Sequence, residues 1–304
     1  MSDHTSIEWA DATWSPVSGC TKVSDGCLNC YIARTPPFRM AHRRFDGHDI
    51  GSTTGVQLHP ERLGIPLHWR KPRRIFVCSL ADLFHDEVPT NHIASVWDIA
   101  RRAPQHTFIV LTKRHARMHS LLTSENFQES VFAHSGVSRR SPSYRPYMEH
   151  YRTWPVPNVW VGVTAENQKA FDLREKYLRA TPAAVRFISA EPLLGEIDAT
   201  DRLDGIDWMI VGGESGSNAR PMHPEWAQSL RDQCISAGVP FLFKQWGEHV
   251  TVDQMPADTF VSWDIKYGND FYPQDMPWRV GKKRAGRLLD GHLWDQYPQA
   301  AVHA

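Results

Sequence analysis

Three cysteines near the N-terminus are the residues whose type and spacing are best suited to chemistry. Cys20, Cys27 and Cys30 fall within eleven residues, and such clustering is typical of ligands rather than of isolated thiols. Gly19 and Gly26 each precede a cysteine, and turn-forming residues surround them. The backbone can therefore fold the three sulfurs toward one point, where thiolates would bind a metal.

Three kinds of site are compatible with these cysteines. A structural zinc ion needs four ligands, so the sulfurs would have to recruit His42, His85 or another cysteine. A cubane iron-sulfur cluster held by three cysteines leaves one iron open to a substrate or cofactor. Three unligated thiols are the remaining alternative. Cys78 lies in a predicted strand and Cys234 on an apolar helix face, where cysteines are usually simple buried residues, so three ligands favour the open cluster over zinc.

A second group of candidates consists of polar residues that follow apolar strands. They are Ser79, Asp82, Thr112, Lys113, Glu166, Glu191, Glu214 and Lys244. Because catalytic residues of a (β/α) barrel gather at the carboxyl ends of its strands, we expect these side chains to converge on one mouth. Buried charges are costly unless they are paired or bind a ligand, so three glutamates there indicate a cationic or hydroxyl-rich ligand. Helix capping and loop solvation are the alternative explanation for any single one of them.

A glycine-rich run, residues 212–216, follows one of these strands. Gly212 and Gly213 could let backbone amides approach an anionic or ribose-bearing ligand, because glycine removes the Cβ barrier to close contact. An ordinary strand-to-helix turn would also need glycines. Both interpretations remain open for this run.

Alternating strands and helices must position all of these residues. Six apolar runs suit strands buried on both faces of a parallel sheet, at residues 75–80, 107–112, 159–163, 185–189, 208–211 and 239–243. Residues 14–17 are a candidate first strand. Helices are expected between the strands, including one that begins at Pro224 and is closed by Gly238. Eight strands would complete a barrel, so we predict an α/β fold with a partial, open (β/α) barrel of about six or seven parallel strands.

The expected domain organisation is one barrel with two additions. Residues 1–248 would form the barrel with its N-terminal cysteine loop, and a polar stretch at about 123–157 would be an insertion. Residues 249–304 lose the strand-helix rhythm and would form a C-terminal extension. Its aromatic residues are expected to pack on the barrel, across its open edge, or over its mouth.

Composition and charge limit the class of protein. The chain has 304 residues, of which 41% are hydrophobic and 22% charged, as in an ordinary globular protein. The first residues lack the features of a signal peptide, and no apolar run reaches eighteen residues. We therefore expect a soluble, cytoplasmic protein with no membrane partner.

Local basic and aromatic residues raise the question of a nucleic-acid or nucleotide substrate. The formal net charge is zero, which provides no global field for nucleic acid. Basic clusters nevertheless occur at residues 39–44, 70–74, 139–140 and 282–287, and aromatic residues near some of them are Trp69, Tyr144, Tyr147 and Tyr151. Such mixtures suit base stacking and phosphate binding, although solvated faces explain them equally well.

Six segments of the chain resemble the phage Gp37/Gp68 family, also called DUF5131. They are residues 7–20 (IEWADATWSPVSGC), 79–85 (SLADLFH), 111–114 (LTKR), 189–195 (SAEPLLG), 211–216 (VGGESG) and 243–247 (FKQWG). The resemblance covers nearly the whole chain. That family is regarded as radical-SAM-like, which implies an iron-sulfur enzyme that performs radical chemistry on an unidentified substrate. The basic and aromatic residues described above make a nucleotide or nucleic acid one candidate for that substrate.

The resemblance also implies roles for individual residues. Cys20, Cys27 and Cys30 would hold a [4Fe-4S] cluster that binds S-adenosylmethionine, and an external electron donor would reduce it. The implied cofactor-binding residues are Ser79, Asp82, Thr112, Glu166, Glu191, Gly212, Gly213 and Glu214. The implied catalytic residues are Lys113, Glu191 and Lys244. The cysteine spacing is longer than in the common radical-SAM pattern, and Asn29 stands where that pattern has an aromatic residue.

A different class of function is the alternative to an enzyme. The protein could be a non-catalytic, nucleic-acid-binding phage accessory protein, in which a metal only staples the cysteine loop. Bound zinc in place of an iron-sulfur cluster would favour this alternative.

Overall fold

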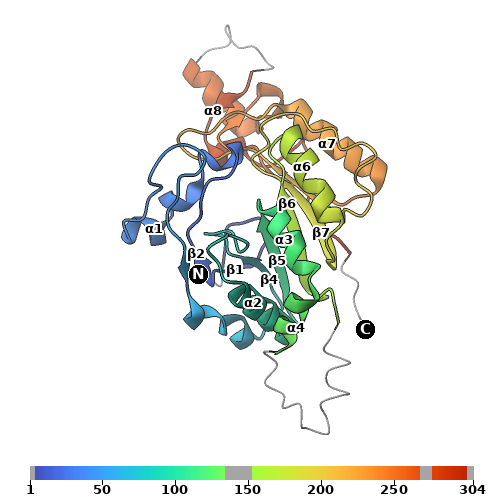
Figure 1. Cartoon of the computed structure of the whole chain (residues 1–304). Helices are drawn as coiled ribbons and strands as arrows, with labels where there is room; N and C mark the ends of the chain where they lie inside the picture. The colour runs from blue at the N-terminus through green and yellow to red at the C-terminus, as the bar shows by residue number, and fades with distance from the viewer. Residues whose placement is uncertain (1–3, 134–152, 268–275, 300–304) are drawn as a thin grey trace. The chain divides into compact units, whose positions relative to one another are not determined.

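The computed structural model describes residues 4–133, 153–267 and 276–299. Strands and helices alternate along most of this length (Figure 1). The chain divides into two compact units. The first unit contains Met1–Val23, Ile32–Val163 and Arg174–Arg186, and the second contains Ser24–Tyr31, Thr164–Leu173 and Phe187–Ala304.

Seven strands form the main sheet, in the order β1-β4-β5-β6-β7-β8-β9. Their bounds are Ala12–Trp14 (β1), Arg74–Val77 (β4), Thr107–Thr112 (β5), Val159–Thr164 (β6), Val185–Ala190 (β7), Trp208–Gly212 (β8) and Phe241–Gln245 (β9). The pairs β1–β4, β4–β5, β5–β6, β7–β8 and β8–β9 are all parallel. The prediction of an α/β fold with six or seven parallel strands is therefore confirmed. The strand order alone does not identify a radical-SAM fold.

The first unit buries its strands beneath helices on the sheet's face. Helix α2 (Thr90–Arg102) lies beside α4 (Glu125–Ala133), as Figure 1 shows. Trp97 of α2 packs edge-on against Phe127 of α4, with ring centroids 6.1 Å apart. Helix α4 lies within the predicted insertion at 123–157, so the first part of that stretch is a packed helix. Residues 134–152, with the predicted Arg139–Arg140 cluster, Tyr144, Tyr147 and Tyr151, lie outside the described residues.

The remaining elements of the first unit are short. They are α1 (Pro36–Met40), α3 (His115–Leu122), the antiparallel pair of β2 (Val17–Ser18) and β3 (Gln57–Leu58), and the 3₁₀ helices η3 (Pro60–Arg62) and η4 (Ile65–His68). The helices η2 (Tyr31–Arg34) and α6 (Gln168–Arg179) contain residues of both units, as do strands β6 and β7. Helix η1 (Asp25–Cys27) belongs to the second unit.

The second unit continues the alternation through α7 (Pro224–Ala237). Pro224 occupies the first turn, and Gly238 ends the helix in the left-handed conformation with φ of 69°, as the sequence predicts. The other elements of this unit are the antiparallel pair of β10 (His249–Val250) and β11 (Trp278–Arg279), η5 (Val252–Gln254), α8 (Ala257–Tyr267) and α9 (Lys282–Ala285).

The end of the C-terminal extension packs along strand β9. The amide of Phe243 donates to the carbonyl of Trp294 at 2.9 Å, and the amide of Gln296 donates to the carbonyl of Phe241 at 3.2 Å. The indole of Trp208 donates to the carbonyl of Gln296 at 2.8 Å. These bonds satisfy backbone groups that an edge strand would otherwise leave unpaired.

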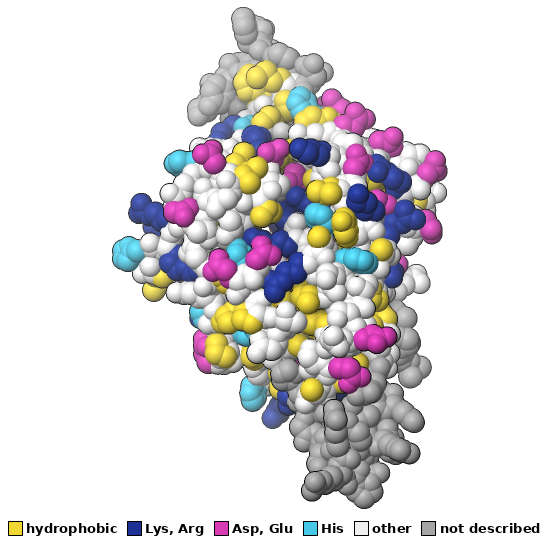
Figure 2. All heavy atoms as spheres, in the orientation of Figure 1, with side chains coloured by type: hydrophobic (Ala, Val, Ile, Leu, Met, Phe, Trp, Pro, Cys, Tyr) yellow, Lys and Arg dark blue, Asp and Glu magenta, His cyan; other side chains and the backbone are white. Residues whose placement is uncertain are grey.

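Charge on the surface is mixed. Acidic and basic side chains are interspersed on the face drawn in Figure 2, with no extended area of one sign. This distribution agrees with the formal net charge of zero. Within the described part of the chain, no helix is both long and apolar enough to cross a membrane.

Candidate functional site

Asp82, which follows β4 in the first unit, is saturated with hydrogen bonds. Its Oδ1 accepts from the amide of Phe84 at 3.0 Å and from the hydroxyl of Thr112 at 2.7 Å. Its Oδ2 accepts from the amide of Lys113 at 3.0 Å and lies 3.2 Å from Nη1 of Arg114. The two charged side chains are 8% and 9% exposed. Asp82 therefore ties the carboxyl ends of β4 and β5 together, which leaves it little capacity for a ligand.

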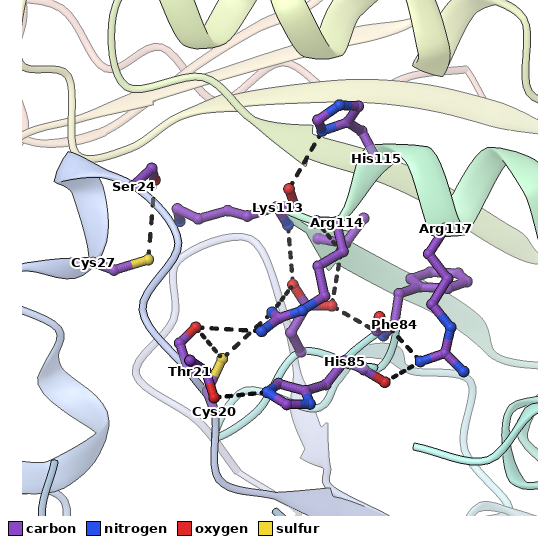
Figure 3. A network of polar contacts seen from close by, with 12 residues as sticks. Cys20, Thr21, Ser24, Cys27, Phe84, His85, Lys113, Arg114, His115 and Arg117 are labelled. Atoms are coloured by element: carbon purple, nitrogen blue, oxygen red, sulfur yellow. Dashed lines mark hydrogen bonds and ion pairs between the residues drawn. The ribbon is translucent and has the colours of Figure 1, made fainter. Parts of the chain in front are cut away.

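Arg114 connects this carboxylate to the first cysteine (Figure 3). Its Nη1 lies 3.8 Å from the sulfur of Cys20, and its Nη2 donates to the carbonyl of Thr21 at 3.3 Å. Burial opposes the charge of Arg114, but the Asp82 carboxylate and the Cys20 sulfur outweigh this cost and raise the pKa of the guanidinium. Arg114 thus stays charged and anchors the segment that precedes the cysteine loop.

The predicted residues Ser79 and Lys113 also lie at the strand ends of the first unit. Ser79 is half-buried in the turn after β4. The side-chain ammonium of Lys113 makes no hydrogen bond or ion pair with a residue that the structure describes. Lys113 therefore retains a cation that could meet an anionic group.

In the second unit, Glu191 and Lys244 form an ion pair at the carboxyl ends of β7 and β9. Nζ of Lys244 lies 2.6 Å from Oε1 of Glu191, and the side chains are 15% and 17% exposed. Gly212, at the end of the intervening strand β8, leaves room for the pair. A Cβ at this position would lie 3.3 Å from Oε1 of Glu191 and 3.4 Å from Cβ of Lys244.

This ion pair keeps unused hydrogen-bonding capacity. Within the described ranges, Lys244 uses one of its three N–H groups, and Glu191 accepts no further bond. Ser189 lies two residues before Glu191 along β7 and pairs in register with Ile210 of β8. Because side chains alternate between the two faces of a sheet, the Ser189 side chain lies on the same face as that of Glu191. Its hydroxyl is fully buried and has no hydrogen-bond partner among the described residues. Buried hydroxyl groups normally have a hydrogen-bond partner, and a bound substrate could supply the partner for Ser189.

Glu214, by contrast, is fully engaged. Its carboxylate accepts from the amide, Nε and Nη2 of Arg220 at 2.8, 2.9 and 2.7 Å, and from Nδ2 of Asn29 at 3.0 Å. Burial alone would raise the pKa of Glu214, but these bonds outweigh burial and hold the pKa below its usual value. Glu214 therefore holds the loop around Asn29 in place. The sequence analysis did not predict Arg220. Its position six residues after Glu214 is the one local feature that could have indicated this pair.

Two further predicted residues lie in closely packed surroundings. The Glu166 side chain is 1% exposed, and its Oε1 accepts from the amide of Gly26 at 3.4 Å. A Cβ on Gly213 would lie 1.9 Å from the carbonyl oxygen of Trp246, so only glycine fits where these two backbones meet. Packing is thus sufficient to require Gly213.

The cysteines do not form the predicted metal site. Cys20 belongs to the first unit and Cys27 and Cys30 to the second. Across the described residues there is no group of three or more His, Cys, Asp or Glu side chains that could hold a metal ion. The Cys20 sulfur contacts the Thr21 carbonyl at 3.6 Å as well as Arg114, and the Cys27 sulfur lies 4.0 Å from Oγ of Ser24. The prediction of a [4Fe-4S] cluster with S-adenosylmethionine is therefore wrong.

The zinc alternative also finds no group of ligands among the described residues. Nε2 of His85 lies 2.9 Å from the hydroxyl of Thr21, and its Nδ1 accepts from the amide of Glu87 at 3.1 Å, so both ring nitrogens are engaged. Cys78 and Cys234 are buried, as the sequence predicts. Burial raises the pKa of both thiols, to about 12 for Cys234, because it disfavours the charged thiolate.

Residues 4–298 match the profile of a family described as a protein of unknown function, DUF5131. The chain belongs to the DUF5131 family. No curated protein and no solved structure matches, so nothing in these comparisons supports a radical-SAM assignment for this DUF5131 member.

Three arginines of the predicted basic clusters of this DUF5131 chain make internal contacts. Arg43 donates to Ser18 Oγ at 2.9 Å and to backbone carbonyls, and Arg74 pairs with Asp11 at 3.0 Å. Arg73 stacks over the ring of Trp69 at 5.0 Å. These three arginines therefore have internal partners, while the alternative of a nucleic-acid-binding accessory protein stays a prediction.

Proposed function

We propose that the protein is an enzyme in which Glu191 and Lys244 transfer protons to and from a small polar substrate. The observation that carries the proposal is their close ion pair, which lies at the carboxyl ends of parallel strands and keeps donors and acceptors unused. Catalytic residues of parallel α/β folds occupy this position. Asp82 and Glu214 are less suitable because their hydrogen bonds are already taken.

The chemistry of such a pair is general acid–base catalysis. The Glu191 carboxylate accepts a proton from an O–H, N–H or acidic C–H group of the substrate. The Lys244 ammonium stabilises the negative oxygen that develops and returns a proton to it. The buried Ser189 hydroxyl offers a further hydrogen bond on the same face of the sheet.

The unused N–H groups of Lys244 also indicate a class of substrate. An ammonium group binds phosphate and carboxylate oxygens as a point charge. A nucleotide, or a nucleic-acid component, has the phosphate that such a group would recognise. We therefore propose a phosphate-bearing substrate of this kind.

Turnover of a mixture of metabolites tests the proposal while the substrate is still unidentified. Purified protein is incubated with a cell extract of polar metabolites, and mass spectrometry identifies compounds that are consumed. Loss of the general base lowers rates by about 10²- to 10⁴-fold, so Glu191→Gln should slow consumption by that factor. Lys244→Met should also slow it strongly.

Matched variants separate catalysis from folding. Glu225→Gln in α7 and Lys283→Met in α9 alter exposed residues of the same types and should leave the rate unchanged. Circular dichroism checks that every variant is folded. The proposal fails if the wild-type protein consumes no compound, or if folded Glu191→Gln works at the wild-type rate.

A further inference from the structure

Cys27 and Cys30 are separated by two residues and lie at the two ends of a tight turn. The amide of Cys30 donates to the carbonyl of Cys27 at 3.1 Å, which is the hydrogen bond of a four-residue turn. The ends of such a turn lie less than about 7 Å apart between Cα atoms. Disulfides join residues whose Cα atoms are about 4.4–6.8 Å apart, so this backbone is compatible with a bond between the two sulfurs.

The turn is held in place on both sides. Nδ2 of Asn29 donates to Glu214 at 3.0 Å and to the carbonyl of Asn218 at 2.7 Å. Nη2 of Arg220 donates to the carbonyl of Asp25 at 2.9 Å. All of these residues belong to the second unit. The Glu214–Arg220 pair thus fixes the backbone around the two cysteines, and little conformational entropy remains to be lost when their sulfurs join.

Accessibility distinguishes this pair from Cys78 and Cys234. Cys27 and Cys30 are both half-buried, whereas Cys78 and Cys234 are fully buried. Thiol–disulfide exchange requires a thiolate that a disulfide reagent can reach. Cys27 and Cys30 satisfy the access requirement, and the two buried cysteines do not.

We propose that Cys27 and Cys30 form a redox-active dithiol that exchanges with low-molecular-weight disulfides such as oxidised glutathione. One cysteine thiolate attacks a sulfur of the reagent, forms a mixed disulfide and releases one glutathione thiol. The second cysteine thiolate then attacks the mixed disulfide and releases the other thiol. Two protein thiols are oxidised to one disulfide, and one molecule of oxidised glutathione is reduced to two thiols.

Equilibration in glutathione buffers tests the dithiol directly. The full chain is incubated at a series of ratios of reduced to oxidised glutathione, quenched with acid and alkylated, and its peptides are analysed by mass spectrometry. We expect a bond between Cys27 and Cys30 that appears and disappears reversibly with the ratio. Cys78 and Cys234 should remain reduced at every ratio.

Three variants make the result specific. Cys27→Ser and Cys30→Ser should each lose the internal disulfide and instead carry one glutathione on the remaining cysteine. Cys20→Ser, in the first unit, should still form the Cys27–Cys30 bond. Absence of that bond at every ratio, or preferential pairing of Cys20 with either partner, would overturn the proposal. The readout does not depend on Glu191 or Lys244, so this inference stands or fails separately from the proposed enzyme activity.

Discussion

Acidic residues at the ends of strands differ in the number of hydrogen bonds that they accept. Asp82 accepts four contacts from residues of its own unit and pairs with the buried Arg114. Glu191 accepts one, from Lys244. A saturated carboxylate stabilises the loop that it binds, whereas an unsaturated one remains available to a substrate. An acidic residue at a strand end therefore cannot be assigned a role from its type alone. The number of hydrogen bonds that its carboxylate already accepts must also be known.

The structural role of Asp82 leads to a stability prediction. Asp82→Asn removes the charge that neutralises Arg114, and breaking a buried ion pair from one side costs about 3–5 kcal/mol. Urea denaturation followed by circular dichroism should show a loss of this size in the free energy of unfolding. Asp86→Asn, at an exposed neighbouring position, should change stability by less than about 0.5 kcal/mol. Equal stability of Asp82→Asn and the wild type would show that the pair contributes nothing.

Among the secondary-structure elements, the edge strand β9 is covered by the end of the C-terminal extension. Strand β9 ends the order of the main sheet, and residues 294–296 supply hydrogen bonds to its backbone. Unprotected edges recruit other strands and aggregate. The C-terminal extension thus has a structural function along β9, whatever else the remainder of it does.

Truncation of the extension tests this function. A chain that ends at Asp290 loses Trp294 and Gln296, so the edge of β9 becomes exposed. We expect a lower midpoint of thermal unfolding and aggregation that increases with protein concentration, measured by differential scanning fluorimetry and light scattering. A chain that ends at Pro298 keeps both residues and should behave as the full-length protein. A soluble truncation with an unchanged midpoint would contradict the proposed role.

At the scale of the molecule, buried histidines couple stability to pH. Among the residues that the structure describes, six histidines have pKa values below the usual value, in each case mainly because burial disfavours the charged ring: His59, His85, His92, His106, His115 and His249. The unfolded chain therefore binds more protons than the folded chain just below the usual pKa of about 6.5. Stability rises with pH wherever the unfolded state binds more protons.

The resulting pH dependence has a definite sign. The stabilisation from the neutral histidines is fully present above about pH 6.5 and is lost as the pH falls toward their lower folded pKa values. Carboxylates with lowered pKa values, such as Glu214 and Asp290, add a further loss at more acidic pH. Thermal unfolding measured from about pH 8 to about pH 4 should show a midpoint that declines below about pH 6.5. A midpoint that is flat or rises as the pH falls through this range would contradict the prediction.

The sequence by itself determined the class of fold and many of its elements. Apolar runs and turn residues are local signals, and they sufficed for six of the seven parallel strands and for helix α7 with its Gly238 cap. The first strand is Ala12–Trp14 rather than the expected residues 14–17. The cysteine cluster misled, because spacing along the chain does not state what each sulfur contacts. Cys20 meets an arginine from the end of β5, while Cys27 and Cys30 lie in the other unit.

Only the tertiary structure decided which polar residues are available for chemistry. The partners of these residues are remote in sequence: 53 positions separate Glu191 from Lys244, and 185 separate Asn29 from Glu214. Hydrogen bonds depend on distance and direction in space, and a single sequence does not encode these in any local pattern. For the same reason the sequence does not indicate the roles of Arg114 and Arg220, which follow from their carboxylate partners Asp82 and Glu214 in the folded chain.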